Sequence, residues 1–300
     1  MFVILGASGH TGSVVAGTLL KKREKVRVVG RNKERLGSLV RQGAEAFVAD
    51  ASDPQALTKA FEGARGAYSL IPPNRSAPDF RSYQDRVSGA IAQALENARV
   101  KHVVALSSTG ADKESGTGPV VGLHQMERRL NQIQGLNVLH IRAGYFMENT
   151  LPQASLVRNL GTTAGPVRAD LPLPMIATRD IGAFAAEELA KLQFSGKQTR
   201  ELLGQRDITY NEVARIIGSA INKPDLSYKQ LPDEQVIQGM VQMGMSRNMA
   251  ELLCQMADAL NRGYMKALEP RTPANTTPTS YEHFVREVWL PAYQGKAASA

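Results

Sequence analysis

The sequence predicts an α/β fold in which a doubly wound parallel sheet is followed by a smaller, mainly helical second domain. Through the first half of the chain, short apolar runs alternate with longer segments whose apolar residues recur at helical spacing. The composition, 43% hydrophobic and 21% charged, is that of a globular protein, and 300 residues suffice to bury a full core. We therefore expect one domain over residues 1–148 and a second over residues 149–300.

The apolar runs of the first half predict six strands, at residues 2–5, 26–30, 44–49, 66–71, 102–106 and 138–141. Parallel strands need crossover connections, which are usually helices that lie on the faces of the sheet. The segments between the runs have the helical spacing that such crossovers require, at residues 11–22, 54–61, 80–97 and 122–134.

After Gly144 the pattern changes to stretches punctuated by proline and glycine. Helices are expected there at residues 180–191, 210–221, 234–243 and 247–265. Part of the segment 175–204 is expected to return to the main sheet, with a late strand at residues 200–204, so that the two domains interleave. Residues 269–279 are expected to be irregular, residues 281–289 helical and the final GKAASA frayed.

Composition also restricts the compartment and the chemistry. No apolar run approaches the roughly 18–20 residues that a membrane-spanning helix needs, and no basic leader precedes the apolar start, so a signal peptide is not expected. Cys254 is the single cysteine, which excludes an internal disulfide or a cysteine metal cluster. No two histidines have metal-ligand spacing, so no metal site is expected. These features predict a cytoplasmic protein.

The net charge of +8, with basic residues concentrated between Lys21 and Arg35, raises the question of nucleic acid as a partner. No recognition helix, zinc finger or aromatic-interleaved motif accompanies the excess. A basic zone beside a phosphate-binding turn suits a phosphorylated small ligand equally well. We therefore do not expect nucleic-acid binding.

The first predicted strand runs directly into a glycine-rich turn that opens a helix, with the residues Gly6, Ala7, Ser8, Gly9, His10, Thr11 and Gly12. In such a turn Gly6 permits the tight bend, Gly9 lets a pyrophosphate approach the backbone, and Gly12 lets the helix pack closely on the strand. The helix N-terminus offers free N–H groups to the phosphates, and His10 is expected to touch phosphate or water. This context predicts a dinucleotide-binding domain of the Rossmann type.

The second strand ends at Gly30-Arg31, where a protein that binds NAD usually carries an acidic residue to hold the ribose hydroxyls. Arg31 instead suits the 2′-phosphate of NADP(H), with Lys33 and Arg35 close behind it. Asp50 follows the third strand, where its carboxylate is placed to accept a hydrogen bond from the adenine amine. The alternative for Asp50 is a helix cap before Pro54.

Four features are informative in combination: Arg31, the glycine turn, the sequence HQME at residues 124–127 and the run RAGYFMEN at residues 142–149. With them the chain resembles the NmrA-like family of atypical short-chain dehydrogenases/reductases. The branch of NADPH-dependent quinone oxidoreductases is most similar. TRDIG at residues 178–182 and ITYNE at residues 208–212 extend the resemblance over roughly residues 1–290.

The resemblance implies an NADPH-dependent reductase of a quinone or a similar apolar conjugated carbonyl. Ordinary short-chain dehydrogenases use a Tyr-x-x-x-Lys pair as the proton donor, but none of the eight tyrosines here is followed by lysine four residues later. The family also suggests an alternative, a non-catalytic NADP(H)-binding redox sensor that acts through a protein partner. A third class, an isomerase or tailoring enzyme on the same fold, stays open, as does a homodimer.

Several residues are candidates for contact with cofactor or substrate. The loop after the fourth strand is expected to line the site, with Ile71 and Pro72 on the cofactor and Asn74 on the substrate. Ser107, at the end of the fifth strand, is expected to donate or accept a hydrogen bond with the nicotinamide or the substrate, or else to cap a loop.

The remaining candidates concern the substrate. His124, on the helix after the fifth strand, is the one candidate for catalysis, as a proton donor or carbonyl ligand, unless it only caps or packs. Tyr145 and Phe146 are expected to wall the substrate site. Asn149 is expected to line it or to cap the next helix. Methionines in the later helices suit an adaptable apolar pocket or plain core.

Overall fold

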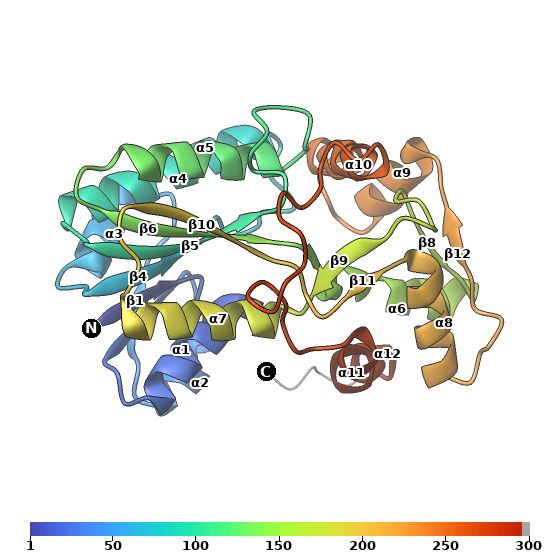
Figure 1. The fold of residues 1–300 in the computed structure, drawn as a ribbon, viewed down its shortest axis with the longest axis horizontal. Helices are drawn as coiled ribbons and strands as arrows, with labels where there is room; N and C mark the ends of the chain where they lie inside the picture. The colour runs from blue at the N-terminus through green and yellow to red at the C-terminus, as the bar shows by residue number, and fades with distance from the viewer. Residues whose placement is uncertain (296–300) are drawn as a thin grey trace.

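In the computed structural model, which describes residues 1–295, a large parallel sheet covered by helices forms one end of the molecule (Figure 1). A smaller group of helices and short strands forms the other end. The predicted α/β class is confirmed. Of the GKAASA segment that was expected to be frayed, residues 296–300 lie outside the described residues.

The main sheet contains seven parallel strands, in the spatial order β3 (Glu45–Val48), β2 (Val26–Gly30), β1 (Phe2–Leu5), β4 (Gly66–Ser69), β5 (His102–Ser108), β6 (Asn137–Ala143) and β10 (Lys197–Leu202). Six of these are the predicted strands. The seventh, β10, lies inside the segment 175–204 and pairs with β6, although it begins three residues before the predicted strand at residue 200. The order of strands reverses at β1, where ligands of such sheets bind.

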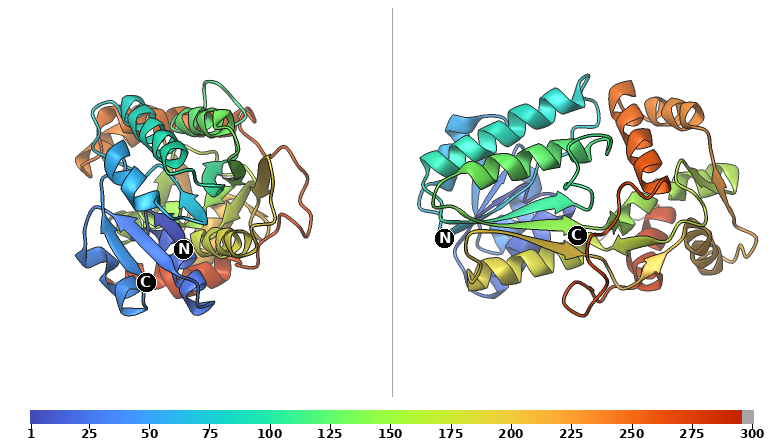
Figure 2. Two further views of the ribbon diagram at one scale, coloured as in Figure 1. Left: turned by 90° about the vertical axis from the view of Figure 1, so that its left-hand side faces the viewer. Right: turned by 45° about the horizontal axis from the view of Figure 1, so that its top comes forward.

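Helices cover both faces of the sheet, as the crossover connections require (Figures 1 and 2). One face carries α1 (His10–Lys21), α2 (Gly37–Arg41) and α7 (Thr178–Lys191), and the other carries α3 (Pro54–Phe61), α4 (Phe80–Asn97) and α5 (Val120–Gln132). Successive strand residues point to opposite faces. Phe2 and Ile4 of β1 therefore pack in the core under α1, while Val3 and Leu5 pack under α3 and α4.

The smaller part is less exclusively helical than the sequence predicted. Its α-helices are α6 (Gln153–Leu160), α8 (Tyr210–Ala220), α9 (Asp233–Gln242), α10 (Arg247–Asn261), α11 (Tyr281–Phe284) and α12 (Leu290–Tyr293). They are accompanied by the short 3₁₀ helix η2 (Met147–Thr150) and the π-helix η3 (Val285–Trp289). Two small sheets accompany them, β11 (Asp207–Ile208) with β9 (Leu173–Ile176) and β7 (Tyr145–Phe146), and β12 (Tyr228–Gln230) with β8 (Thr163–Gly165). The sequence missed these strands because two to four residues show no usable periodicity.

The two parts are joined by direct hydrogen bonds. The backbone N–H of Phe80, at the start of α4, donates to Asn248 Oδ1 on α10 (2.9 Å). The backbone N–H of Ser246 donates to the carbonyl of Arg75 in the loop after β4 (2.9 Å). The chain also returns from the smaller part to the main sheet through α7 and β10. The domain boundary predicted at residue 148 therefore stays a prediction.

The segment 269–279 was expected to be irregular, and it contains no helix or strand as it runs from α10 to α11 beside the end of β10 (Figure 1). Glu201 accepts hydrogen bonds from the backbone N–H groups of Leu268 and Glu269 (2.9 Å each). Asp180 accepts from the N–H and hydroxyl of Thr279 (3.0 and 2.7 Å). Two carboxylates therefore hold both ends of this segment against the larger part.

The contact between α1 and α7 depends on a residue without a side chain. A Cβ added at Gly182 of α7 would lie 2.7 Å from the carbonyl oxygen of Thr11 and 2.7 Å from Val14 Cβ, both on α1. The backbone of α1 cannot move away from α7 without disturbing the glycine turn that precedes α1. Gly182 therefore fixes how closely the two helices approach.

We predict opposite effects for two helical glycines. Gly182→Ala forces α7 away from α1 and is expected to lower the free energy of unfolding by about 1–3 kcal/mol. Gly89→Ala on α4, where an added Cβ meets nothing within 4 Å, is expected to raise it by up to about 1 kcal/mol through helix propensity. Denaturant unfolding measures both variants, and equal effects would contradict the close contact.

Candidate cofactor and active site

The glycine turn between β1 and α1 is closed by its own backbone. Gly6 has φ of 68°, a conformation that favours glycine, and its N–H donates to the carbonyl of Val29 on β2 (3.1 Å). The N–H of Gly9 donates to the carbonyl of Gly6 (2.9 Å). A Cβ at Gly12 would lie 2.4 Å from that same carbonyl oxygen. The tight bend at Gly6 and the close helix packing at Gly12 thus have a structural basis, whereas the approach of a pyrophosphate to Gly9 stays a prediction.

The N-terminus of α1 is open to a ligand. Its N-cap residue, Gly9, provides no side-chain cap, and the first turn contains no acidic residue. Ser8, Gly9 and His10 are exposed. The first N–H groups of a helix have no partner within the helix, and with the helix dipole they form a site for an anion.

Two residues of the predicted turn, Ala7 and Thr11, are buried against the sheet. Ala7 is fully buried, and its N–H already donates to the carbonyl of Val29 (3.3 Å). The hydroxyl of Thr11 accepts a hydrogen bond from buried Tyr68 on β4 (2.9 Å). The side chain of Thr11 therefore anchors α1 to the sheet, and only its backbone faces the turn.

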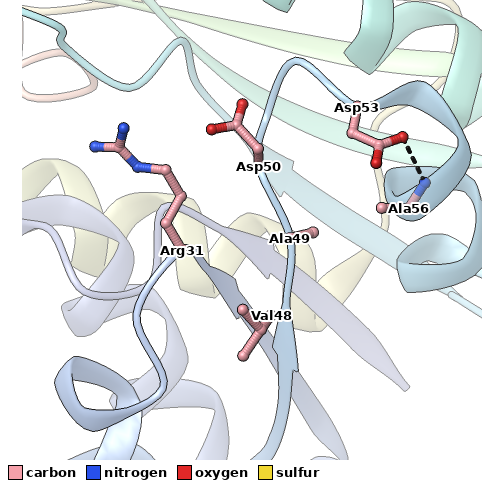
Figure 3. Close-up of a pocket in the computed structure, with 6 residues that line it drawn as sticks. All are labelled: Arg31, Val48, Ala49, Asp50, Asp53 and Ala56. Atoms are coloured by element: carbon pink, nitrogen blue, oxygen red, sulfur yellow. Dashed lines mark hydrogen bonds between the residues drawn. The ribbon is translucent and has the colours of Figure 1, made fainter.

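Beside the turn, the ends of β2 and β3 and the start of α3 border an open cavity of about 410 Å³ lined by Arg31, Val48, Ala49, Asp50, Asp53 and Ala56. The side chains of Arg31 and Asp50 extend to the same side, beyond the strand ends, whereas Asp53 turns toward the amide of Ala56 (Figure 3). Arg31 and Asp50, which the sequence predicted from separate strands, are thus brought together.

Asp50 is not a helix cap. Asp53 caps α3 instead, accepting from the N–H groups of Gln55 and Ala56 (3.0 Å each), so the alternative prediction for Asp50 is wrong. The carboxylate of Asp50 accepts from the hydroxyl and the N–H of Ser52 (2.6 and 2.8 Å). These bonds, helped by the charge of Arg31, lower the pKa of Asp50 below its usual value. Asp50 is therefore an ionised acceptor beside Arg31.

The loop after β4 lies against the turn. The side chain of Leu70 approaches within 3.2 Å of where a Cβ of Gly6 would stand. Pro72 accepts a hydrogen bond from the hydroxyl of Tyr83 on α4 (2.7 Å), and Ile71 packs at the edge of the core under α3 and α4. Asn74 accepts from the hydroxyl of Ser76 (3.1 Å). Ile71, Pro72 and Asn74 thus form a fixed loop at this sheet edge, and their ligand contacts stay predictions.

Ser107 belongs to a buried polar network. Its hydroxyl donates to Glu127 Oε1 (2.6 Å), and the guanidinium of Arg142 donates to both oxygens of the same carboxylate (3.0 and 2.6 Å). The side chain of Ser107 is 1% exposed. The side chain of Ser107 therefore supports β5, β6 and α5, and its contact with a cofactor stays a prediction.

The geometry of His124 limits its chemistry. Its Nδ1 lies 2.8 Å from the carbonyl of Ala111, which only accepts, so Nδ1 carries a proton. In the neutral ring Nε2 is then an acceptor, and it is buried without a partner among the described residues. His124 ties α5 to the loop after β5. Its proton-donor role stays a prediction and requires the imidazolium form.

The predicted substrate wall lies where β6 passes into the smaller part. The hydroxyl of Tyr145 is 2.9 Å from that of Tyr210, and burial raises the pKa of Tyr145. Asn149 is exposed and lies close enough to Tyr145 to oppose that rise. The next helix, α6, follows Pro152 and has no side-chain cap, so the alternative prediction that Asn149 caps it is wrong. Phe146 packs against the core under α1 and α7.

The sequence did not single out Glu148 and Thr178. Glu148 accepts hydrogen bonds from the N–H of Thr178 (3.0 Å) and from its hydroxyl (2.5 Å), at the first residue of α7. Burial raises the pKa of Glu148, while these hydrogen bonds and nearby His10 lower it. Both residues lie in the segments that carried the family resemblance, but a separation of 30 residues gave no sign that they meet.

Residues 1–295 contain neither a cluster of metal-ligating side chains nor a helix suited to span a membrane. No three histidine, cysteine, aspartate or glutamate side chains gather closely enough to hold a metal ion in that part of the chain. None of its helices is both long and apolar enough to cross a membrane.

The strand order and the glycine turn define a Rossmann-type α/β protein. The model of the NmrA-like family matches residues 1–284, and the chain belongs to that family. A curated relative, the NmrA-like family domain-containing oxidoreductase himF of Aspergillus japonicus, is 34% identical over 168 residues, which cover 52% of this chain and 50% of himF. The chain thus matches about half the length of that relative.

Solved structures share the fold at low identity. The NADPH-dependent quinone oxidoreductase QOR2 of Escherichia coli, complexed with NADPH, has a TM-score of 0.81 and 22% identity over 96% of this chain and 100% of its own. The triphenylmethane reductase of Citrobacter sp., complexed with NADP(H), has a TM-score of 0.78 and 19% identity over 95% and 99%. At these identities the likeness shows the fold alone.

Proposed function

We propose that this protein is an NADPH-dependent oxidoreductase that reduces a quinone or a similar apolar conjugated carbonyl. The observation that carries the proposal is the uncapped, acid-free N-terminus of α1 beside the cavity of Arg31 and Asp50. The printed names of himF, QOR2 and the triphenylmethane reductase support it, since all are oxidoreductases or reductases and the last two were crystallised with NADPH or NADP(H).

The residues present fit that cofactor. The first N–H groups of α1, at His10, Thr11 and Gly12, would bind the pyrophosphate, and Arg31 would pair with the 2′-phosphate. The carboxylate of Asp50 would accept a hydrogen bond from the adenine amine. Bound NADPH would supply the hydride to the substrate at the carboxyl ends of the central strands.

The contacts of the described side chains favour a mechanism in which the protein orients cofactor and substrate, rather than one in which a side chain donates a proton. His124 holds its Nδ1 proton on a backbone carbonyl, and Ser107 donates to Glu127. A quinone tolerates this lack of a dedicated acid, because hydride addition yields a resonance-stabilised anion that takes its proton from water. Correct positioning of the two reactants then supplies most of the rate.

The same observations favour one other candidate, a redox sensor that binds NADP(H) without turnover and acts through a protein partner. The sensor needs the cofactor site but no proton donor. Turnover separates the two candidates, since fold alone does not.

Replacing Arg31 tests the choice of cofactor. Arg31→Asp removes a charge-assisted bond and adds repulsion, so we expect the Kd for NADPH to rise by about 100-fold while that for NADH changes by less than about threefold. Isothermal titration measures both. Arg128→Ala, which removes an exposed arginine on α5, is the control. Equal losses for the two cofactors would refute the 2′-phosphate assignment.

Turnover tests the reaction. Purified protein is expected to oxidise NADPH in the presence of small quinones, with saturation and above the uncatalysed rate, as followed by NADPH absorbance. Binding of NADPH without turnover of any quinone would favour the sensor.

The variant His124→Gln belongs in the same assay. Its amide can still donate to the carbonyl of Ala111, so we expect turnover to stay within about threefold of the parent chain, well short of the loss expected for a missing proton donor. A loss of turnover of about 100-fold or more would instead identify His124 as the proton donor.

A further inference from the structure

Two tyrosine hydroxyls meet where the larger part of the molecule joins the smaller. Tyr145 begins β7, directly after β6 and Gly144, and Tyr210 is the first residue of α8. Their hydroxyl oxygens lie 2.9 Å apart, and their rings meet edge to face with centroids 6.3 Å apart. A hydrogen bond between side chains therefore links the end of the main sheet to the smaller part.

Tyr210 is held firmly on its own side of this bond. It is 4% exposed, and its ring stacks on that of Tyr228 with centroids 4.4 Å apart. The hydroxyl of Tyr228 donates to the carbonyl of Val167 (2.9 Å). A capping box at the N-terminus of α8 fixes the backbone at Tyr210. The hydroxyl of Tyr210 is therefore held in place beside that of Tyr145.

Burial decides which of the two hydroxyls donates. Each phenol carries one proton, and within residues 1–295 the hydroxyl of Tyr210 bonds only that of Tyr145. If Tyr145 donated, the proton of Tyr210 would stay buried without an acceptor, which is costly. Tyr210 therefore donates and Tyr145 accepts. Because Tyr145 is only half-buried, its own proton is left for a ligand or for water.

The order of the strands puts Tyr145 toward the nicotinamide end of the proposed cofactor site. Arg31 and Asp50 lie beyond β2 and β3, and the glycine turn follows β1. A dinucleotide with its adenosine at the first place and its pyrophosphate at the second continues toward β4, β5 and β6. Tyr145 follows β6 and packs against the apolar cluster that contains Ala111 and Val120, which follow β5.

A neutral phenol at this place suits a substrate whose oxygen becomes negative. Burial raises the pKa of Tyr145, so the phenol keeps its proton at neutral pH and acts as a hydrogen-bond donor. When a quinone accepts a hydride, negative charge develops on its carbonyl oxygen, and a donor already oriented toward that oxygen stabilises the charge.

We propose that Tyr145 is a specificity-determining residue of this site, whose hydroxyl, oriented by Tyr210, donates a hydrogen bond to the carbonyl oxygen of the substrate. This inference rests on the proposed function, because it names a contact to the substrate of the same reaction. The substrate accepts a hydride from NADPH, its oxygen takes up the negative charge, and water supplies the proton while Tyr145 keeps its own. Acceptors that gather charge on oxygen are thereby favoured.

Three variants that each remove one hydroxyl and keep the ring test the assignment, with menadione as the quinone. Tyr145→Phe is expected to lower kcat about tenfold, while the KM for menadione and the Kd for NADPH change less than about twofold, because the bond strengthens as charge develops. Tyr210→Phe frees the Tyr145 hydroxyl to turn and should lower kcat about threefold. Tyr228→Phe, which loses the bond to Val167, is the control with unchanged kcat. Thermal melts confirm that each variant is folded.

An unchanged kcat in Tyr145→Phe would overturn the inference. A loss that Tyr228→Phe matches would also overturn it, since the hydroxyls would then serve only packing. A weaker affinity for NADPH in Tyr145→Phe would assign the residue to the cofactor instead of the substrate. In these cases the proposed function stands, provided that the parent chain reduces menadione. A parent chain that binds NADPH but reduces no quinone contradicts the proposed function, and the inference fails with it.

Discussion

The position of the first turn of α1 depends on two contacts that only glycine permits. Gly12 brings the helix onto the carbonyl of Gly6, and Gly182 brings α7 onto the carbonyl of Thr11. The buried bond from Tyr68 to Thr11 holds the same turn on β4. Because backbone rather than flexible side chains sets these distances, the free N–H groups of α1 are held in place before any ligand arrives.

The N-termini of α1 and α7 therefore lie close together, but their N–H groups are satisfied in different ways. The first residue of α7 is satisfied from within, by the carboxylate of Glu148. The N-terminus of α1 has neither cap nor acid, and His10 beside it is exposed. The protein thus satisfies one positive helix end and leaves the other to an external anion, which is the electrostatic basis for the proposed pyrophosphate site.

Most of the fold could be predicted because its signals are local. Six of the seven strands of the main sheet lie in apolar runs, and the glycine turn carries its own context in a few consecutive residues. Asp50 and Arg31 could also be found, since both follow strands whose carboxyl ends share one edge.

The features of the site that could not be predicted from the sequence depend on tertiary contacts. The sequence predicts Ser107 as a ligand of nicotinamide or substrate or as a loop cap, and nothing in the neighbouring sequence reveals its bond to Glu127, which Arg142 also contacts. The tautomer of His124 depends on a carbonyl of the loop before α5.

The central claim is that the N-terminus of α1 binds the pyrophosphate of a dinucleotide. Hydrogen exchange followed by mass spectrometry, with and without saturating NADPH, tests it most directly. The account predicts that the peptide spanning residues 6–14 shows the largest protection, since the first N–H groups of α1, which have no partner within the helix, gain acceptors. Saturable NADPH binding that leaves this peptide unprotected would contradict the account.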